Sequence, residues 1–189
     1  MVKKSTTLKY LKSSAIKPNL LVIIARPGAG KSTLIGHWRK NNRGYRQLDV
    51  YPFVKRVGII NGKISPAQIK KAYNNFYKYV SKVVRDRDII EIGISHPELN
   101  MKNIARLKLQ VKINIFFLIR NTKDCFKYKK KQRGKAYDSS ELRERMRRPF
   151  PSTHNKLAIK YGLETNQILM HYGYTAAVRV IERVLDDSR

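Results

Sequence analysis

Runs of apolar residues alternate with amphipathic stretches along the chain, and these runs predict the strands of a sheet. Residues 20–25 are all apolar, as is typical of a strand buried on both faces. Less uniform runs predict further strands at 46–51, 88–94, 111–119 and 167–172. Because strands that alternate with helices favour a parallel sheet, we expect an α/β fold with helices on both faces of five strands.

The stretches between the runs predict helices. Residues 31–40 and 175–186 have helical spacing, and the best-marked helix follows Ser65, where a serine, a proline and Gln68 form a capping box. One face of this helix is apolar, and it consists of Ile69, Ala72, Tyr73, Phe76, Val80, Val83 and Val84. We interpret its aromatic residues as core rather than as a platform for stacking bases. Just upstream, Asn61-Gly62 predicts a hairpin turn.

A basic segment at 120–148 differs from its surroundings. It holds 12 Lys or Arg and 4 Asp or Glu. Thr122 is a candidate cap for one helix, Asp138 or Ser139 for the next, and Gly134 suggests a turn between them. The segment therefore predicts a small helical basic lid, after which Pro149 and Pro151 break the pattern.

Composition allows one domain, and positive charge is its unusual feature. We expect a basic extension at 1–19 and a single domain at 20–189. The 189 residues include 41 Lys or Arg against 13 Asp or Glu, giving a net charge of +28 and a pI near 10.4. Such a charge attracts a polyanion, and nucleic acid (DNA or RNA) is the leading expectation, although a basic proteome would have the same composition.

Cysteine content and hydropathy exclude several classes of protein. The single cysteine, Cys125, excludes an internal disulfide framework and a cysteine metal cluster, and we expect it to be packed. No run approaches the roughly 18 apolar residues of a membrane span. Residues 1–19 lack the apolar centre of a secretory signal. We therefore expect a soluble, cytoplasmic protein.

Residues 25–32, with the sequence ARPGAGKS, match the phosphate-binding loop pattern except that Ala25 replaces the first glycine. Glycines let the backbone wrap a phosphate chain, and the following helix presents its positive N-terminus. Lys31 is expected to reach the terminal phosphates and Ser32 to coordinate Mg²⁺. The predicted nucleotide-binding residues are Pro27, Gly28, Ala29, Gly30, Lys31, Ser32 and Thr33. Since the loop lies between a buried strand and a helix, it predicts a three-layer P-loop NTPase fold.

Three further residues are candidates for phosphoryl transfer. Glu91, in the predicted strand 88–94, can hold a magnesium-bound water or the acceptor, and Asp49 follows the second strand at the same edge of the sheet. A surface carboxylate or a structural salt bridge is the alternative for each. Arg133 can swing over the phosphates from the lid, and the neighbouring lysines at 129–131 can instead form a solvated helix face.

Other patterns carry less information. The four histidines have no metal-like spacing, and we expect them on helix surfaces or in loops; they are His37, His96, His154 and His171. Trp38 is expected to pack. The nearest match to a guanine-reading motif, at 155–158, lacks its aspartate, which disfavours a GTPase.

Taken together, the loop and four other segments resemble the P-loop kinase superfamily, and specifically the kinase domain of bacteriophage polynucleotide 5′-kinases. The segments that carry the resemblance are 26–33, 44–49, 99–103, 132–135 and 142–146. The resemblance implies that Asp49 is the general base, that Arg133 covers the donor phosphates, and that Lys31 and Ser32 have their usual roles. The family's arginine after the aspartate is replaced by Pro52, for which Arg56 is a possible substitute, and Glu91 stands where the family has an aspartate.

These observations predict an ATP- and Mg²⁺-dependent transfer of a γ-phosphoryl group to a hydroxyl, with a nucleic-acid 5′ end as the leading acceptor. One alternative is a kinase for a nucleotide or small metabolite, because P-loop kinases include those. A second alternative is a nucleic-acid-binding P-loop ATPase, and a third is a nonenzymatic basic binding protein. The acceptor and the oligomeric state stay open at this stage.

Overall fold

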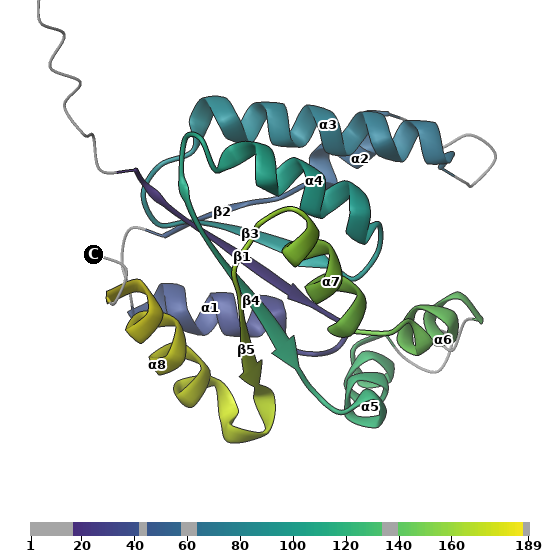
Figure 1. Cartoon of the computed structure of the whole chain (residues 1–189). Helices are drawn as coiled ribbons and strands as arrows, with labels where there is room; N and C mark the ends of the chain where they lie inside the picture. Colours follow the sequence, from purple (N-terminus) through teal and green to yellow (C-terminus); the bar gives the residue numbers. More distant parts are fainter. Residues whose placement is uncertain (1–16, 42–44, 58–63, 134–139, 187–189) are drawn as a thin grey trace, which may run out of the picture.

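Five parallel strands form one sheet in a computed structural model of the chain, in the order β2-β3-β1-β4-β5. The structure describes residues 17–41, 45–57, 64–133 and 140–186. The strands are β1 Asn19–Ala25, β2 Arg46–Leu48, β3 Asp88–Gly93, β4 Lys112–Ile119 and β5 Thr165–Leu169. The predicted parallel sheet is confirmed, and β1 lies at its centre (Figure 1).

Helices cover both faces of the sheet, which gives three layers (Figure 1). One face is covered by α1 Lys31–Asn41 and α8 Gly173–Asp186. The other face is covered by α3 Pro66–Val83, α4 Pro97–Leu107 and α7 Ser152–Lys160, and the short α2 Tyr51–Arg56 packs on α3. The helices α5 Thr122–Arg133 and α6 Ser140–Arg147 lie beyond the carboxyl ends of the strands, where the basic lid was predicted.

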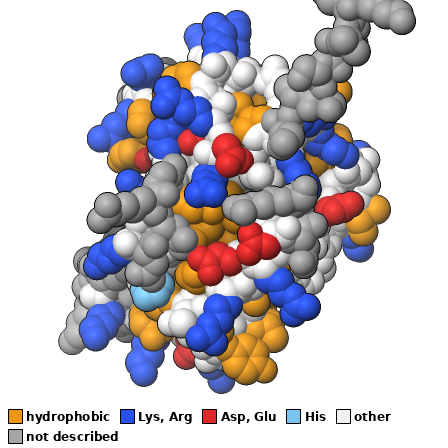
Figure 2. Space-filling view, turned by 90° about the vertical axis from the view of Figure 1, so that its left-hand side faces the viewer, with side chains coloured by type: hydrophobic (Ala, Val, Ile, Leu, Met, Phe, Trp, Pro, Cys, Tyr) orange, Lys and Arg blue, Asp and Glu red, His pale blue; other side chains and the backbone are white. Residues whose placement is uncertain are grey.

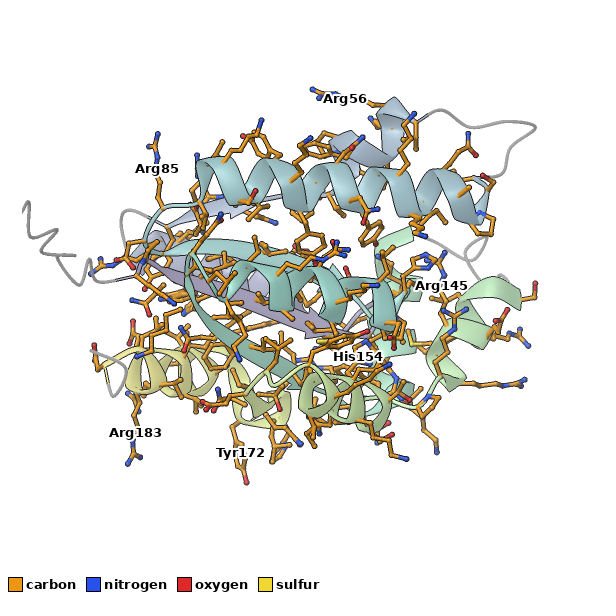
Figure 3. The ribbon with its side chains drawn as sticks, turned by 45° about the horizontal axis from the view of Figure 1, so that its top comes forward. Arg56, Arg85, Arg145, His154, Tyr172 and Arg183 are labelled. Carbon is orange, nitrogen blue, oxygen red and sulfur yellow. The ribbon has the colours of Figure 1, made fainter. Side chains whose placement is uncertain are left out.

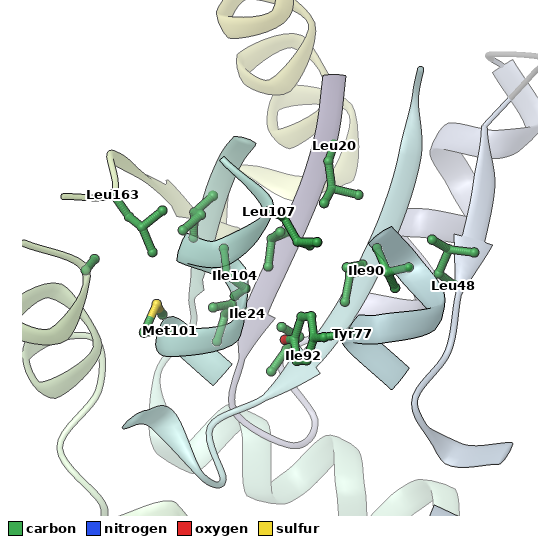
Figure 4. Close-up of a cluster of buried hydrophobic side chains, with 14 of the residues drawn as sticks. Leu20, Ile24, Leu48, Tyr77, Ile90, Ile92, Met101, Ile104, Leu107 and Leu163 are labelled. Carbon is green, nitrogen blue, oxygen red and sulfur yellow. The ribbon is translucent and has the colours of Figure 1, made fainter. Parts of the chain in front are cut away.

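The apolar run of β1 supplies both cores. Leu20, Val22 and Ile24 point into the core beneath α3, α4 and α7. Figure 4 shows Leu20 and Ile24 in this core. The alternate residues Leu21 and Ile23 point into the core beneath α1 and α8. All five are fully buried. Each buried aliphatic side chain contributes about 1.5–3 kcal/mol, so the central strand is held firmly from both sides.

Two strands differ from their predicted bounds by more than one residue. β2 ends at Leu48 rather than at residue 51, because the Asp49 side chain accepts the Tyr51 N–H at 2.9 Å and Pro52 favours a helix start there. β5 begins at Thr165 rather than 167, and Met170–Tyr172 is a 3₁₀ helix (η2). The helix α2 was therefore missed, since its residues had been assigned to a strand and a loop.

The helix signals had mixed outcomes. The capping box of α3 is confirmed, since Ser65 accepts the Gln68 N–H at 3.2 Å and the Gln68 side chain accepts the Ser65 N–H at 2.8 Å. The capping prediction for Thr122 was wrong: the Asn121 side chain accepts the Lys123 N–H at 2.8 Å. The predicted turn at 61–62 and the predicted caps at 138 and 139 lie outside the described residues.

The helix α7 was also missed, because Pro149 and Pro151 were interpreted only as breakers. Pro151 in fact stands at the N-cap of α7, and its carbonyl accepts the Asn155 N–H at 2.9 Å. Within the residues that the structure describes, no helix is both long and apolar enough to cross a membrane.

Candidate functional site

The loop between β1 and α1 is a tight turn whose two glycines are required by its geometry. Gly28 has φ +77° and Gly30 has φ +95°, both in the left-handed region. A Cβ at Gly28 would overlap the Cys125 carbonyl of α5, and one at Gly30 would lie 2.7 Å from the Tyr174 hydroxyl of α8. The loop is therefore in close contact with both α5 and α8. Ala25 ends β1, so the missing first glycine does not disturb the turn.

The N-terminus of α1 faces the ligand side of this loop. The helix begins at Lys31, directly after Gly30, and its first turn contains no acidic side chain. The first N–H groups of a helix have no partner within the helix and carry a partial positive charge. The loop and the helix start therefore form a cradle suited to the phosphates of a nucleotide.

Lys31 extends along this cradle and is largely buried, with 11% of its side chain exposed. Its Nζ donates to the Ala25 carbonyl at 3.3 Å and lies 4.0 Å from Glu91 Oε1. Burial lowers the pKa of Lys31, and the charge of Glu91 opposes this effect. The ammonium is thus held beside the loop by two weak contacts that a phosphate can replace.

Glu91 lies against the helix start from the neighbouring strand β3. Its Oε1 accepts the Ser32 hydroxyl at 2.8 Å, and its Oε2 accepts Gln47 Nε2 at 3.0 Å. Carboxylate and hydroxyl oxygens are ligands that Mg²⁺ takes, and adjacent oxygens on an octahedral Mg²⁺ ion lie about 3 Å apart. Ser32 and Glu91 therefore fit a magnesium ion at the edge of the phosphate cradle.

Asp49 lies at the carboxyl end of β2, on the same edge of the sheet as the loop. It is exposed, and its Oδ1 caps α2 by accepting the Tyr51 N–H. Within the described part of the chain, no cation forms an ion pair with this carboxylate. Asp49 is thus an accessible acceptor of a proton, with its orientation fixed by the start of α2.

Cationic side chains surround the loop on its lid side. Arg26 donates to the Arg148 carbonyl at 2.9 Å and lies over the Phe150 ring at 5.6 Å, which ties the end of α6 to the loop. Burial and then the charges of Arg148 and Arg145 lower the pKa of His96. Figure 3 shows Arg145 at this end of the molecule. The predicted lid residue Arg133 ends α5, but its side chain lies outside the described residues.

The expectation for the histidines was wrong for His154, which sequence reasoning missed. Its side chain is 2% exposed on α7, between the rings of Phe117 and Phe150. Neither ring nitrogen has a hydrogen-bond partner among the described residues. Burial, and secondarily the charge of Arg26, lowers the pKa of His154 to about 4. Its signal was the four-residue spacing of His154 and Ala158, which places both on one face of α7, and Ala158 is also buried.

A pocket of about 620 Å³ lies beside the loop, between α5 and η2. Its lining includes Arg120, Tyr128 and His171, and the Arg120 guanidinium lies 4.8 Å from the centre of the Tyr128 ring. The same helix α5 also carries Cys125, whose carbonyl lies against Gly28, so one wall of the pocket is a helix that contacts the phosphate loop. Its flat groups suit an aromatic ring such as a nucleobase. No sequence pattern indicated this pocket, since it joins residues about 50 positions apart.

Two other expectations are confirmed: Cys125 and Trp38 are both fully buried. Of the two aromatic residues in the predicted α3 stripe, Phe76 is likewise core and Tyr73 is partly buried against it; Tyr77, outside the stripe, is buried as well. Among the described residues, no cluster of His, Cys, Asp and Glu has the arrangement of a metal site.

Solved structures share this fold. A shikimate kinase from Acinetobacter baumannii in complex with shikimate superposes with a TM-score of 0.61 at 14% identity, over 92% of this chain and 95% of that one. A deoxyadenosine kinase from M. mycoides gives 0.51 at 16% identity, over 90% and 100%. A chain of the Pnkp1/Rnl/Hen1 RNA repair complex gives 0.58 at 16% identity over 79% of this chain, which spans about half (48%) of that chain.

The sequence itself matches no family model and no curated protein. The identities to the solved structures are low, so what the similarity establishes is the fold. The chain has the P-loop NTPase fold in the form that these kinases have.

Proposed function

We propose that the protein is an ATP-dependent phosphotransferase that moves the γ-phosphoryl group to a hydroxyl acceptor. The observation that carries the proposal is the juxtaposition of the glycine loop, Lys31, and the Ser32–Glu91 pair at one edge of the sheet, with Asp49 on the same edge. The fold similarity supports it, because the similar structures include enzymes that are kinases.

In the proposed complex, the phosphates of ATP lie on the backbone N–H groups of the loop and of the start of α1. Lys31 exchanges its contact with the Ala25 carbonyl for the terminal phosphates, and the base lies in the pocket beside Arg120 and Tyr128. Ser32 and Glu91 hold Mg²⁺, which when bound neutralises charge on the β- and γ-phosphates.

Asp49 accepts the proton of the acceptor hydroxyl as its oxygen attacks the γ-phosphorus. The bond from this phosphorus to the bridging oxygen of ADP breaks in the same step, so that ADP leaves with the bonding electrons. Lys31, and Arg133 from the lid, neutralise the charge that develops. Phosphoryl transfer requires mainly positioning and charge, and the site offers both.

A 5′-hydroxyl end of DNA or RNA is the leading acceptor, because a small acceptor does not require a net charge of +28. The structural similarity to a chain of an RNA repair complex is consistent with this choice. A nucleotide or small metabolite is the second candidate, and it is favoured by the shikimate and deoxyadenosine kinases, whose folds match over nearly the whole chain.

A transfer assay with γ-labelled ATP and Mg²⁺ tests the proposal. The acceptors are 5′-hydroxyl DNA, 5′-hydroxyl RNA and a panel of nucleosides. We expect label on an oligonucleotide end, with a loss of about a thousandfold for Lys31→Ala, which removes charge neutralisation from the transition state. Asp49→Asn should lose at least about a hundredfold, in line with the usual contribution of a general base.

Asp86→Asn is a matched control, since Asp86 is an exposed aspartate at the opposite end of the sheet. It should transfer label within about twofold of the wild type. If the label appears only as free phosphate and Asp49→Asn still releases it, the kinase proposal is overturned in favour of an ATPase. Full activity of Lys31→Ala would exclude any catalytic use of the loop.

A further inference from the structure

The chain between Asp49 and Asp86 contains no carboxylate, although it forms a complete helical pair on the outside of the molecule. Its eight basic residues are Lys55, Arg56, Lys63, Lys70, Lys71, Lys78, Lys82 and Arg85. Acidic residues are interspersed with the basic ones in the lid segment, at 124, 138, 141 and 144. The positive charge of α2 and α3 therefore has no carboxylate within its own segment to balance it.

A groove of about 680 Å³ runs between α2 and α3 on this surface. Phe53 and Tyr79 form apolar parts of its lining, and Arg56, Lys71, Lys78 and Lys82 form its charged parts. All three lysines are exposed, and within the described residues none of them forms an ion pair or donates a hydrogen bond. The groove thus presents ammonium groups whose positive charge is available to a partner.

The three lysines lie on one face of α3. Their spacing of seven and four residues returns to the same side of a helix, with Asn75 between them on that side. At 1.5 Å per residue, Lys71 and Lys82 are about 16 Å apart along the helix. That length exceeds the size of one phosphate group several times, so the row spans more than one phosphate of a strand. The row of lysines therefore matches a chain of phosphates better than a single phosphate.

Aromatic rings accompany the charges. Tyr79 is 42% exposed and lies 5.5 Å from Phe53 between ring centres. Tyr51, at the start of α2, is 57% exposed, and Lys55 Nζ lies 4.8 Å from the centre of its ring. Proteins that bind single strands combine a positively charged groove with aromatic rings on which bases stack. Both features are present here, and an acidic protein partner would use only the first.

One wall of the groove follows the candidate active site along the chain. The carboxylate of Asp49 caps α2, and α2 carries Phe53 and Arg56 of the lining. Figure 3 shows Arg56 on α2 and Arg85 beyond the end of α3, both projecting away from the sheet. A strand that lies along α3 can thus extend its end toward the carboxyl edge of the sheet.

We propose that the groove between α2 and α3 binds the backbone of a single-stranded nucleic acid. That the bound strand is also the phosphoryl acceptor rests on the function proposed above. Lys71, Lys78 and Lys82 neutralise successive phosphates, and Tyr79 stacks on a base.

A binding assay tests the proposed strand site. Fluorescence anisotropy follows the binding of a 20-nucleotide 5′-hydroxyl DNA strand that is labelled at its 3′ end, in the absence of ATP. The variant Lys71→Gln/Lys78→Gln/Lys82→Gln should bind at least about tenfold more weakly at 100 mM salt. Its slope of log Kd against log salt should fall by about 2, because each lost phosphate contact to a single strand removes about 0.7. Tyr79→Ala should weaken binding about tenfold and leave the slope unchanged.

The matched control is Lys40→Gln/Lys102→Gln/Lys156→Gln, which removes the same charge from exposed positions on α1, α4 and α7. It should bind within about threefold of the wild type. Equal weakening in the groove and control variants would show that binding follows net charge alone and would overturn the groove. Wild-type binding by the groove variant would overturn it as well.

Transfer of label to a single nucleoside 3′-phosphate, measured in parallel, separates this proposal from the kinase. Retained transfer to the small acceptor with lost strand binding supports both. If the wild type transfers label to no acceptor, while the groove variant no longer binds the strand, the binding proposal is supported and the kinase proposal is overturned.

Discussion

The two ends of the sheet are both polar, yet they differ in how their polar groups are used. The amino end holds a larger cavity than the pocket beside the loop, at about 1050 Å³ against about 620 Å³. Its cations already have partners: Lys17 donates to the Lys108 carbonyl at 3.0 Å, Lys108 donates to the Gly162 carbonyl, and Arg87 pairs with Asp86 at 3.6 Å. Figure 2 shows apolar side chains in the hollow at this end, with charges of both signs around it.

The carboxyl end has polar groups that the protein itself does not satisfy. Of the four buried side-chain nitrogens without a partner among the described residues, three belong to Arg26 and His154, beside the phosphate loop. Lys31 lies no closer than 4.0 Å to a carboxylate oxygen of Glu91. Because unpaired buried groups destabilise a fold, their presence at one end indicates a requirement other than stability. Cavity volume alone would select the amino end, where the described cations already have partners.

The same contrast appears on a single strand. Asp88, at the start of β3, is 1% exposed and accepts two hydrogen bonds from Arg46, at 2.9 and 2.7 Å, and one from the Arg85 N–H. Glu91, three residues later, accepts hydrogen bonds from the neutral side chains of Ser32 and Gln47 among the described residues, and the Lys31 ammonium stays 4.0 Å away. The first carboxylate is expected to hold the fold together, and the second to serve the ligand.

The largest expected effect in this comparison is that of Glu91→Gln on phosphoryl transfer. The amide keeps the shape and can still bond with Ser32, but it removes the charge proposed to support Mg²⁺. We expect kcat/KM to fall about a hundredfold, equivalent to about 3 kcal/mol, and the Mg²⁺ concentration for half activity to rise. The free energy of unfolding, measured by urea denaturation, should change by less than about 0.5 kcal/mol. A large loss of stability with normal activity would reverse the assignment.

Asp88→Asn should show the opposite pattern. Removing one partner of a buried, hydrogen-bonded pair leaves polar groups unsatisfied, and since Arg46 is partly exposed we expect a cost of about 2 kcal/mol. Thermal denaturation should show a Tm lower by about 4–8 °C. Transfer activity, measured below the transition, should stay within about threefold. A variant that is fully stable but inactive would place Asp88 in the site.

A pH effect of similar size is expected from His154. Its pKa of about 4 in the folded chain lies below the unfolded value near 6.5, so the unfolded chain binds more protons between these values. Stability is therefore complete above pH 6.5 and falls as the pH drops toward 4, by about 2 kcal/mol between pH 7 and 5. Urea denaturation of His154→Leu should show a smaller difference between the two pH values. His171→Gln, at an exposed histidine, should keep the wild-type difference.

The smallest effect is expected from Lys108→Ala, in the large cavity at the amino end. Its bond to the Gly162 carbonyl is exposed to solvent, so its loss should change the free energy of unfolding by no more than about 0.5–1 kcal/mol. Transfer and strand binding should not change. A fall in either one would show that the amino end also has a ligand.

The sequence allowed correct prediction of features that depend on neighbouring residues. The buried strand β1, the glycine loop and the Ser65 capping box each lie within a few residues, so their local physics is visible in the chain. The contact between Gly28 and Cys125 joins positions 97 residues apart and was not visible. The pocket at Arg120 and the burial of His154 likewise depend on packing between distant elements. The roles of Asp49 and Arg133 stay predictions.

The close contact between Gly28 and the backbone of Cys125 places the thiol of this cysteine on the helix that packs against the phosphate loop. The thiol is the only one in the chain, it is fully buried, and burial raises its pKa, so a maleimide can label it only when the packing around α5 opens. The labelling rate therefore measures how often the helix that contacts the phosphate loop is exposed. Because the Cys125 carbonyl leaves no room for a side chain at position 28, any substitution of Gly28 requires α5 to move away from the loop.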